Sequence, residues 1–405
     1  MLSVRDLWRR HRRKVFISVG VLGSGYLLYK LYGAHRRRLD ALERELAIQR
    51  ESEELMKVQM QAHFENIQTI SDVMTLPHAM HNLSCRVAEE LDLSQLLERL
   101  LQGKGQPNTL TQSEKLNLWE RLKILSFTRM ALSVWATTML SLYTKVQVNI
   151  LGRHLYIDTA RRFESSSTTK EFKGNQISRF IGPLLNGVQV TAQIPEKGGT
   201  FVTNRERESG DLVDKEDQQK FLGTVDFLCQ HGMPPLISDM EAATQEALKG
   251  KQLSHFFNST ALHETIMQIL IIFMSQGSPH SWIKYVMPED SATSRIDDPA
   301  PSDVTEFEQL MMEARAVLLS AEFGSIIEIC MKVVVNAVVE QMGAKFRGGS
   351  IATGLPLARV LPQVAQMCPL LLEEPSKNQF IRIIKCIPEV EPFFTRLYAN
   401  MPSAY

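Results

Sequence analysis

The sequence predicts an all-α fold, an elongated helical bundle with one long central helix, preceded by a single N-terminal transmembrane helix. Three observations support this prediction. Apolar residues recur at three- and four-residue spacing through most of the 405 residues. Strand-like alternation is confined to one short stretch, residues 188–192. One uncharged, mostly apolar stretch, residues 15–29, lies between two basic clusters near the start of the chain.

Residues 15–33 are expected to form the membrane anchor. As a helix, about 19 residues reach roughly 28 Å, close to the ~30 Å thickness of a bilayer's hydrocarbon core. Lys30 lies near the end of this segment, where its stem can carry the charge to the headgroups. A cleaved signal peptide and a buried soluble helix remain alternatives. The five scattered cysteines, an odd number, favour a cytosolic domain with reduced thiols over a secreted one.

A short basic tail, residues 1–14, precedes the anchor. Such a cluster favours anionic lipid headgroups or an insertion receptor. We expect the targeting residues to be Arg9, Arg10, Arg12, Arg13 and Lys14. By the positive-inside rule this cluster places the N-terminus in the cytosol. The whole chain holds 45 basic and 45 acidic residues, so its charge predicts no nucleic-acid partner.

Residues 34–65 read as a juxtamembrane stalk or first helix, with Leu39, Leu42 and Leu46 at helical spacing. A cytosolic helical-bundle domain is expected over residues 66–405. Early in this domain, several leucines share one helical face, and the glycines and proline of residues 103–108 predict a loop. The leucines on that face are Leu93, Leu96, Leu97, Leu100 and Leu101.

The longest helix is predicted over residues 111–150, about 60 Å at ~1.5 Å per residue. Thr111 and Glu114 form a capping-box pattern at its start, and no glycine or proline interrupts it. From Leu132 onward this segment is apolar nearly all round, as expected of a helix at the centre of a bundle.

An exposed insertion is expected at about residues 162–215, which are rich in serine, threonine, glycine and charge. Helical patterns return after it. The predicted helices are residues 218–230, 236–250, 253–276, 303–318, 321–345, 355–367 and 376–398.

Motifs for catalysis or metal binding are incomplete. His263 and Glu264 begin a zinc-protease pattern, but Met267 takes the place of the second histidine. Cys229 and His231 are two residues apart and do not face each other on a helix. We therefore expect no enzyme, no catalytic residue, no metal and no cofactor.

Recognition is the remaining function class, and Trp119 is its best candidate residue. In the first interpretation Trp119 has a purely structural role in the core of the bundle, because amphipathic faces usually point inward. The alternative makes it the anchor of a groove for a partner's amphipathic helix. Lys115 and Lys123, one turn away on either side, would then steer an acidic partner.

Five segments give the chain a family resemblance. The most specific is LWERLKILSFTR at residues 118–129. The other segments are residues 146–150, 156–158, 287–288 and 355–362. With the basic tail and span, they resemble the peroxin-3 family of peroxisomal membrane biogenesis factors, over most of the chain.

The resemblance implies a single-pass protein of the peroxisomal membrane with its helical bundle in the cytosol. It places the basic tail inside the peroxisome, against the expectation from charge. It also implies a docking receptor for peroxin-19, a soluble carrier that delivers membrane-protein cargo and presents an amphipathic helix near its N-terminus. The implied partner-binding residues are Trp119, Leu118, Leu122, Lys123, Lys115, Leu100 and Leu101. Without the resemblance, a signal-anchored scaffold of another organelle's outer membrane, such as the mitochondrial one, fits the same features.

Overall fold

The computed structural model describes residues 71–105, 111–166, 215–277, 280–288, 305–345 and 354–399, together with scattered residues between 26 and 69. The chain divides into two units, Met1–His63 and Phe64–Tyr405. The predicted basic tail, most of the predicted span and residues 167–214 of the predicted insertion lie outside the described residues.

In the first unit, the described residues are helical, and Leu39, Leu42 and Leu46 are exposed. Across the whole described part of the chain, we find no helix that combines the length and the apolar character needed to cross a bilayer.

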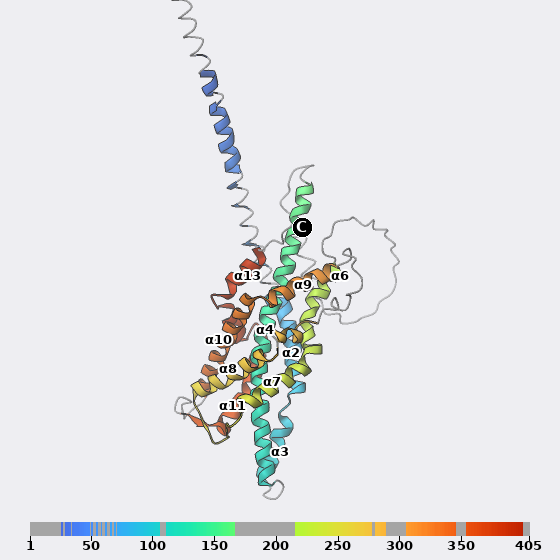
Figure 1. Ribbon diagram of the computed structural model, residues 1–405, viewed down its shortest axis with the longest axis vertical. Helices are drawn as coiled ribbons and strands as arrows, with labels where there is room; N and C mark the ends of the chain where they lie inside the picture. The colour runs from blue at the N-terminus through green and yellow to red at the C-terminus, as the bar shows by residue number, and fades with distance from the viewer. Residues whose placement is uncertain are drawn as a thin grey trace, which may run out of the picture. The chain divides into compact units, whose positions relative to one another are not determined.

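The described residues of the second unit are almost entirely helical, so the all-α part of the prediction is confirmed (Figure 1). Helix α4 contacts most of the other helices, with α11, α7, α13, α10 and α2 as its main neighbours. The elements before the undescribed insertion are η1 (Ser71–Thr75), α2 (Leu76–Glu90), α3 (Ser94–Gly105) and α4 (Gln112–Ser166). Those after it are α6 (Lys215–Gly223), η2 (Thr224–Asp226), η3 (Leu228–Gly232), α7 (Met233–Ala247), β1 (Phe256–Phe257), α8 (Ser259–Ser275), η4 (Ser281–Tyr285), α9 (Glu306–Leu318), α10 (Ala321–Lys345), β2 (Leu355–Pro356), α11 (Leu357–Leu371), α12 (Gln379–Lys385) and α13 (Val390–Ala399).

Helix α4 begins with the predicted capping box. The backbone N–H of Thr111 donates to Glu114 Oε2 at 2.7 Å, and the backbone N–H of Glu114 donates to Thr111 Oγ1 at 3.2 Å. The helix ends at Ser166, well beyond the predicted end at residue 150. Gly152 costs a helix interior only about 1 kcal/mol, which the buried neighbours of α4 readily offset.

The middle of α4 supplies the centre of the core. Trp135 is fully buried, and its ring meets Phe273 edge-on at 5.4 Å between centroids. The indole N–H of Trp135 donates to Met274 Sδ at 3.2 Å, so its polar atom is satisfied inside the core. This arrangement places α8 directly against the central helix.

Several predicted helix boundaries were wrong for local reasons. Asn258 caps α8 by accepting a 2.7 Å hydrogen bond from the Ala261 N–H, so the helix starts at Ser259 and not at 253. The residues before it form a turn and strand β1, which pairs antiparallel with β2. The predicted helix 376–398 is two helices, because Pro388 lies between α12 and α13 and lacks the N–H that continuation would need.

Candidate functional site

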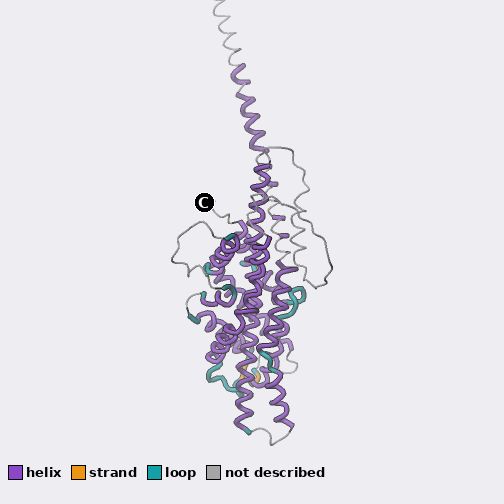
Figure 2. Tube along the Cα trace, turned by 90° about the vertical axis from the view of Figure 1, so that its right-hand side faces the viewer, coloured by secondary structure: helices purple, strands orange, loops and turns teal. Residues whose placement is uncertain are grey.

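Helix α3 and the first turns of α4 extend together beyond the other helices at one end of the second unit (Figures 1 and 2). The two helices pack against each other, and we call this pair, residues 94–105 and 112–125, the α3–α4 hairpin. Both helix starts are capped. Asp92 Oδ1 accepts a 2.9 Å hydrogen bond from the Ser94 N–H, which holds the pKa of the Asp92 carboxyl below its usual value. Thr111 lowers the pKa of Glu114 in the same way.

The described side chains of the hairpin include three large apolar residues that face solvent. The exposed fractions are 43% for Leu97, 68% for Leu101 and 58% for Leu116. A single exposed leucine is common in folded proteins, but the described part of this pair of helices carries three. Exposed leucines on helices can pack against the apolar face of a partner helix.

Trp119 has features of both roles that the sequence allows, a core residue of the bundle and an exposed anchor for a partner helix. Its side chain is half-buried and packs against the main hydrophobic core, while part of it stays accessible. Leu100, Lys115 and Leu118 are also half-buried. The structure therefore gives four of the predicted partner-binding residues an accessible portion, and Leu101 a large one.

Leu122 and Lys123 are placed differently from the prediction, because both are 4% exposed. The Lys123 ammonium donates to the Lys251 carbonyl oxygen at 2.8 Å and pairs with Glu120 at 2.5 Å. The steering role expected for Lys123 would require an exposed ammonium, whereas the structure buries this one and gives it two partners. Leu122 is buried as well, so its side chain offers a partner little surface.

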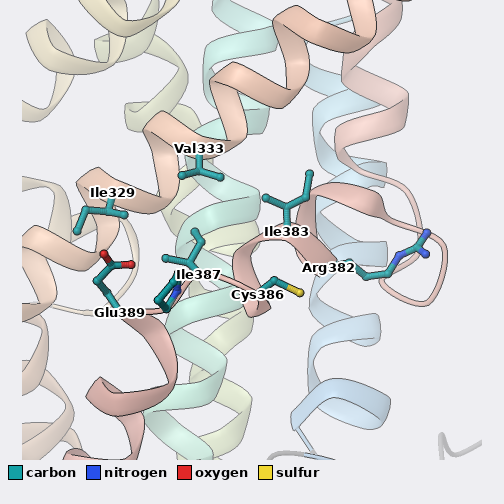
Figure 3. Close-up of a pocket in the computed structure, with 8 residues that line it drawn as sticks. Ile329, Val333, Arg382, Ile383, Cys386, Ile387 and Glu389 are labelled. Atoms are coloured by element: carbon teal, nitrogen blue, oxygen red, sulfur yellow. The ribbon is translucent and has the colours of Figure 1, made fainter.

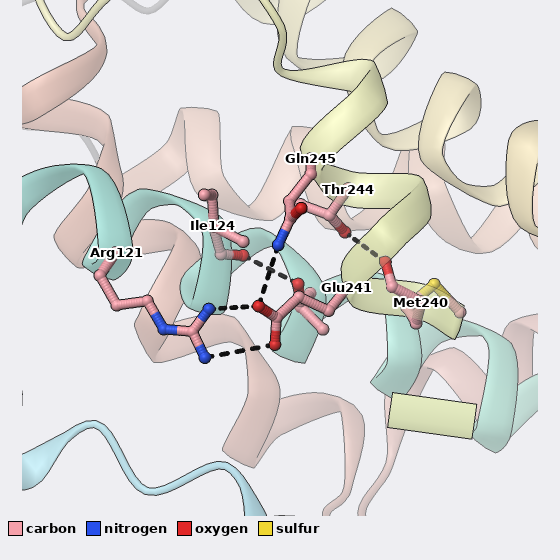
Figure 4. A network of polar contacts seen from close by, with 7 residues as sticks. Arg121, Ile124, Met240, Glu241, Thr244 and Gln245 are labelled. Atoms are coloured by element: carbon pink, nitrogen blue, oxygen red, sulfur yellow. Dashed lines mark hydrogen bonds and ion pairs between the residues drawn. The ribbon is translucent and has the colours of Figure 1, made fainter. Parts of the chain in front are cut away.

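The start of α4 is also tied to α7 by an ion pair. The guanidinium of Arg121 binds both carboxylate oxygens of Glu241, and its Nη2 lies 3.3 Å from Oε2 (Figure 4). Gln245 donates to Glu241 Oε1 at 3.1 Å and keeps the carboxylate oriented. A bidentate pair fixes orientation as well as distance.

Leu97 and Leu116 are not among the predicted binding residues. The leucine pattern places Leu97 on the apolar face of its helix and does not predict that this face is partly exposed. Leu116 precedes Trp119 by three residues, so helical spacing alone places the two on neighbouring parts of the surface. That spacing was the available signal. The predicted targeting residues Arg9, Arg10, Arg12, Arg13 and Lys14 lie outside the described residues.

The residues of the incomplete catalytic motifs lie in η3 and α8, away from the hairpin. Burial raises the pKa of the Cys229 thiol to about 12, so this thiol stays protonated and does not act as a nucleophile. All five cysteines of the chain fall in described segments and are unpaired. Within these segments, no three histidine, cysteine or acidic side chains are grouped as metal ligands.

A shallow groove of about 500 Å³ lies between α10 and the residues around the end of α12. Ile329 and Val333 face Ile383 and Ile387 across it, with Arg382 and Glu389 at its edges (Figure 3). Its walls come from elements other than the α3–α4 hairpin, so it is a separate feature.

Comparison with known proteins connects these features to one family. The family model described as Peroxin-3 matches residues 102–400. Peroxisome biogenesis protein 3-2 of Arabidopsis thaliana is 50% identical over 401 residues, covering 98% of this chain and 99% of that protein. Peroxisomal biogenesis factor 3 of Homo sapiens is 27% identical over 421 residues, covering 98% of this chain and 96% of that protein. With a match across most of its length and a relative of this identity, the chain belongs to the Peroxin-3 family.

Proposed function

We propose that this protein is a docking receptor for the peroxin-19 carrier at the peroxisomal membrane. Family membership gives the broader role, peroxisome biogenesis. The finer role is that the α3–α4 hairpin binds an amphipathic helix near the carrier's N-terminus and holds its membrane-protein cargo beside the bilayer for insertion.

One observation carries this proposal. Trp119 is half-buried in a projecting pair of helices and is accompanied there by the exposed side chains of Leu97, Leu101 and Leu116. The core fixes the ring, so little side-chain entropy is lost on docking. Aromatic residues held in this way are typical anchors of helix-in-groove binding.

The remaining predicted residues would contribute a positive charge and apolar contacts to binding. Lys115 is half-buried, and no described carboxylate forms an ion pair with it. Its ammonium can attract acidic residues that flank the apolar face of a partner helix. Leu100, Leu101 and Leu118 would add apolar contact around Trp119, whereas Leu122 is buried and offers a partner little surface.

We further propose that residues 15–33 anchor the chain in the peroxisomal membrane as a single span, with the basic tail as part of its targeting signal and the bundle in the cytosol. A fluorescent fusion of residues 1–45 tests the targeting. Peroxisomal fluorescence supports the proposal, whereas fluorescence on the outer membrane of mitochondria would support a scaffold of that organelle.

Isothermal titration of the full-length chain, in detergent, with the carrier's N-terminal peptide tests the docking role. A tryptophan side chain buries about 150–250 Å² in all. Since Trp119 already loses most of that area on folding, roughly 50 Å² of the ring and a similar area of the partner remain to be covered. At ~25 cal/mol/Å² this is about 2–3 kcal/mol, a loss of ~30- to 150-fold in affinity for Trp119→Ala.

The matched control is Ile271→Ala, which shortens a 60% exposed residue of α8. It should leave the affinity unchanged. Equal affinity of the Trp119→Ala variant and the parent would refute the docking site.

A further inference from the structure

We propose that Lys123 is a positioning residue of the docking surface, which holds Trp119 in its binding orientation without touching the partner. This inference rests on the proposed docking function. It assigns different tasks to the two lysines that flank Trp119 by one helical turn on either side.

The ammonium of Lys123 is buried and has two partners. Its side chain is 5% exposed, and its ammonium lies 2.8 Å from the Lys251 carbonyl oxygen and 2.5 Å from Glu120 Oε2. Lys123 follows Trp119 by four residues, so the two side chains lie on the same face of α4. A hydrogen bond from Lys123 to another segment therefore fixes the turn of helix that carries the indole.

The acceptor of this hydrogen bond is itself held in place. The backbone N–H of Lys251 donates to the Leu248 carbonyl at 3.0 Å, which closes the turn after α7. The Lys251 ammonium donates to Thr265 Oγ1 on α8 at 2.9 Å. Lys123 thus links the start of α4 to a turn that is anchored to both α7 and α8.

A second contact restrains the same part of α4 from a different side. Arg121 lies two residues after Trp119, about 200° around the helix, where its guanidinium binds the Glu241 carboxylate of α7 (Figure 4). With Lys123 it restrains the helix from two directions. Lys115 lies one turn before Trp119 and makes neither kind of contact among the described residues.

The two roles predict different binding kinetics. A lysine that steers the partner changes the association rate and its dependence on salt. A lysine that only positions the ring leaves both unchanged and alters the dissociation rate, because the complex that forms fits less well. Rate constants therefore separate the roles where an affinity alone does not.

The test measures association and dissociation rates of the carrier's N-terminal peptide on the immobilised full-length chain, from 50 to 300 mM salt. Lys123→Met keeps the length of the side chain and removes the ammonium. Glu120→Gln combined with Lys123→Met also keeps the net charge of the parent. Lys115→Met is the matched comparison, and Trp119→Ala reports the docking function itself.

We expect both Lys123 variants to dissociate about tenfold faster with an unchanged salt dependence of association. Lys115→Met should associate several-fold more slowly at low salt and dissociate at the parent's rate. A salt dependence that falls in Lys123→Met as it does in Lys115→Met would show direct steering and overturn the inference. Parent-like rates in the Lys123 variants would overturn it too.

If Lys123→Met does not fold, Glu120→Gln provides the second variant, because it weakens the ion pair of Lys123 and leaves the lysine in place. Faster dissociation in Glu120→Gln supports positioning by the contacts of Lys123, and an unchanged rate contradicts it. If Trp119→Ala weakens binding while the Lys123 variants do not, the inference fails and the docking function stands. If Trp119→Ala binds like the parent, the docking function itself fails.

Discussion

Replacing Leu101 and Leu116 together with serine should weaken carrier binding without weakening the fold. Complete burial of a leucine contributes about 1.5–3 kcal/mol. Leu101 is 68% exposed and Leu116 58% exposed, so most of that contribution is still available to a partner. If the carrier helix covers both side chains, the double variant loses about 2–4 kcal/mol of binding free energy.

At the lower end this loss corresponds to roughly a 30-fold increase in Kd. The free energy of unfolding should change by less than about 0.5 kcal/mol, since exposed side chains contribute little to the native state. Isothermal titration and urea unfolding of the same preparations measure the two quantities. The control is Ile271→Ser, which removes a 60% exposed side chain from α8.

The result that would refute this reasoning is a double variant with the parent's Kd. It would mean that the carrier helix does not cover the exposed leucines of the hairpin. A large fall in the urea midpoint would refute it differently, because these side chains would then support the fold and not the interface.

Two further predictions concern the fold that holds the hairpin. Gly232→Ala should lower the free energy of unfolding by about 2–3 kcal/mol, because the new Cβ would lie 2.1 Å from the Tyr285 carbonyl oxygen. Urea denaturation measures this change. A midpoint equal to the parent's would contradict the close approach of η3 and η4. Thr111→Ala should speed amide hydrogen exchange in the first turn of α4, since a lost N-cap costs about 1 kcal/mol. Thr111 lowers the pKa of Glu114 in the folded state, so this capping interaction contributes stability above the usual Glu pKa of about 4.5 and loses it as pH falls through the lower folded value. In acid the parent should therefore lose part of this protection and still exchange more slowly than the variant, because the bond from the Glu114 N–H to Thr111 Oγ1 does not titrate; equal exchange in parent and variant at neutral pH would argue against the cap.

The sequence was informative wherever local chemistry decides the structure. The capping box at Thr111 predicted the start of α4, and the absence of glycine and proline up to residue 150 predicted its length up to that point. Gly152 hid the remaining turns, because a glycine inside a well-packed helix costs too little to end it. The helix at Ala321–Lys345 matched its prediction because it is apolar on most sides and contains no proline that would interrupt it.

The site was less predictable, because exposure depends on neighbours that are distant in sequence. Trp119 and Lys123 lie one helical turn apart and look equally available in the sequence. Lys123 is buried because its ammonium binds the Lys251 carbonyl, 128 positions away in the sequence. The pattern of residues in α4 does not predict this contact. Leu116 remains exposed for the converse reason, since none of the later helices that the structure describes covers the projecting end of the hairpin.

Site-specific photocrosslinking tests the central claim most directly, which is that the α3–α4 hairpin is the surface that receives the carrier. A photoreactive phenylalanine analogue is placed at position 101, 116 or 271 of the full-length chain, and each protein is irradiated with the carrier's N-terminal peptide. We predict crosslinks from positions 101 and 116 and none from position 271. A crosslink from position 271 alone would contradict the claim, because it would place the carrier on α8 and away from Trp119.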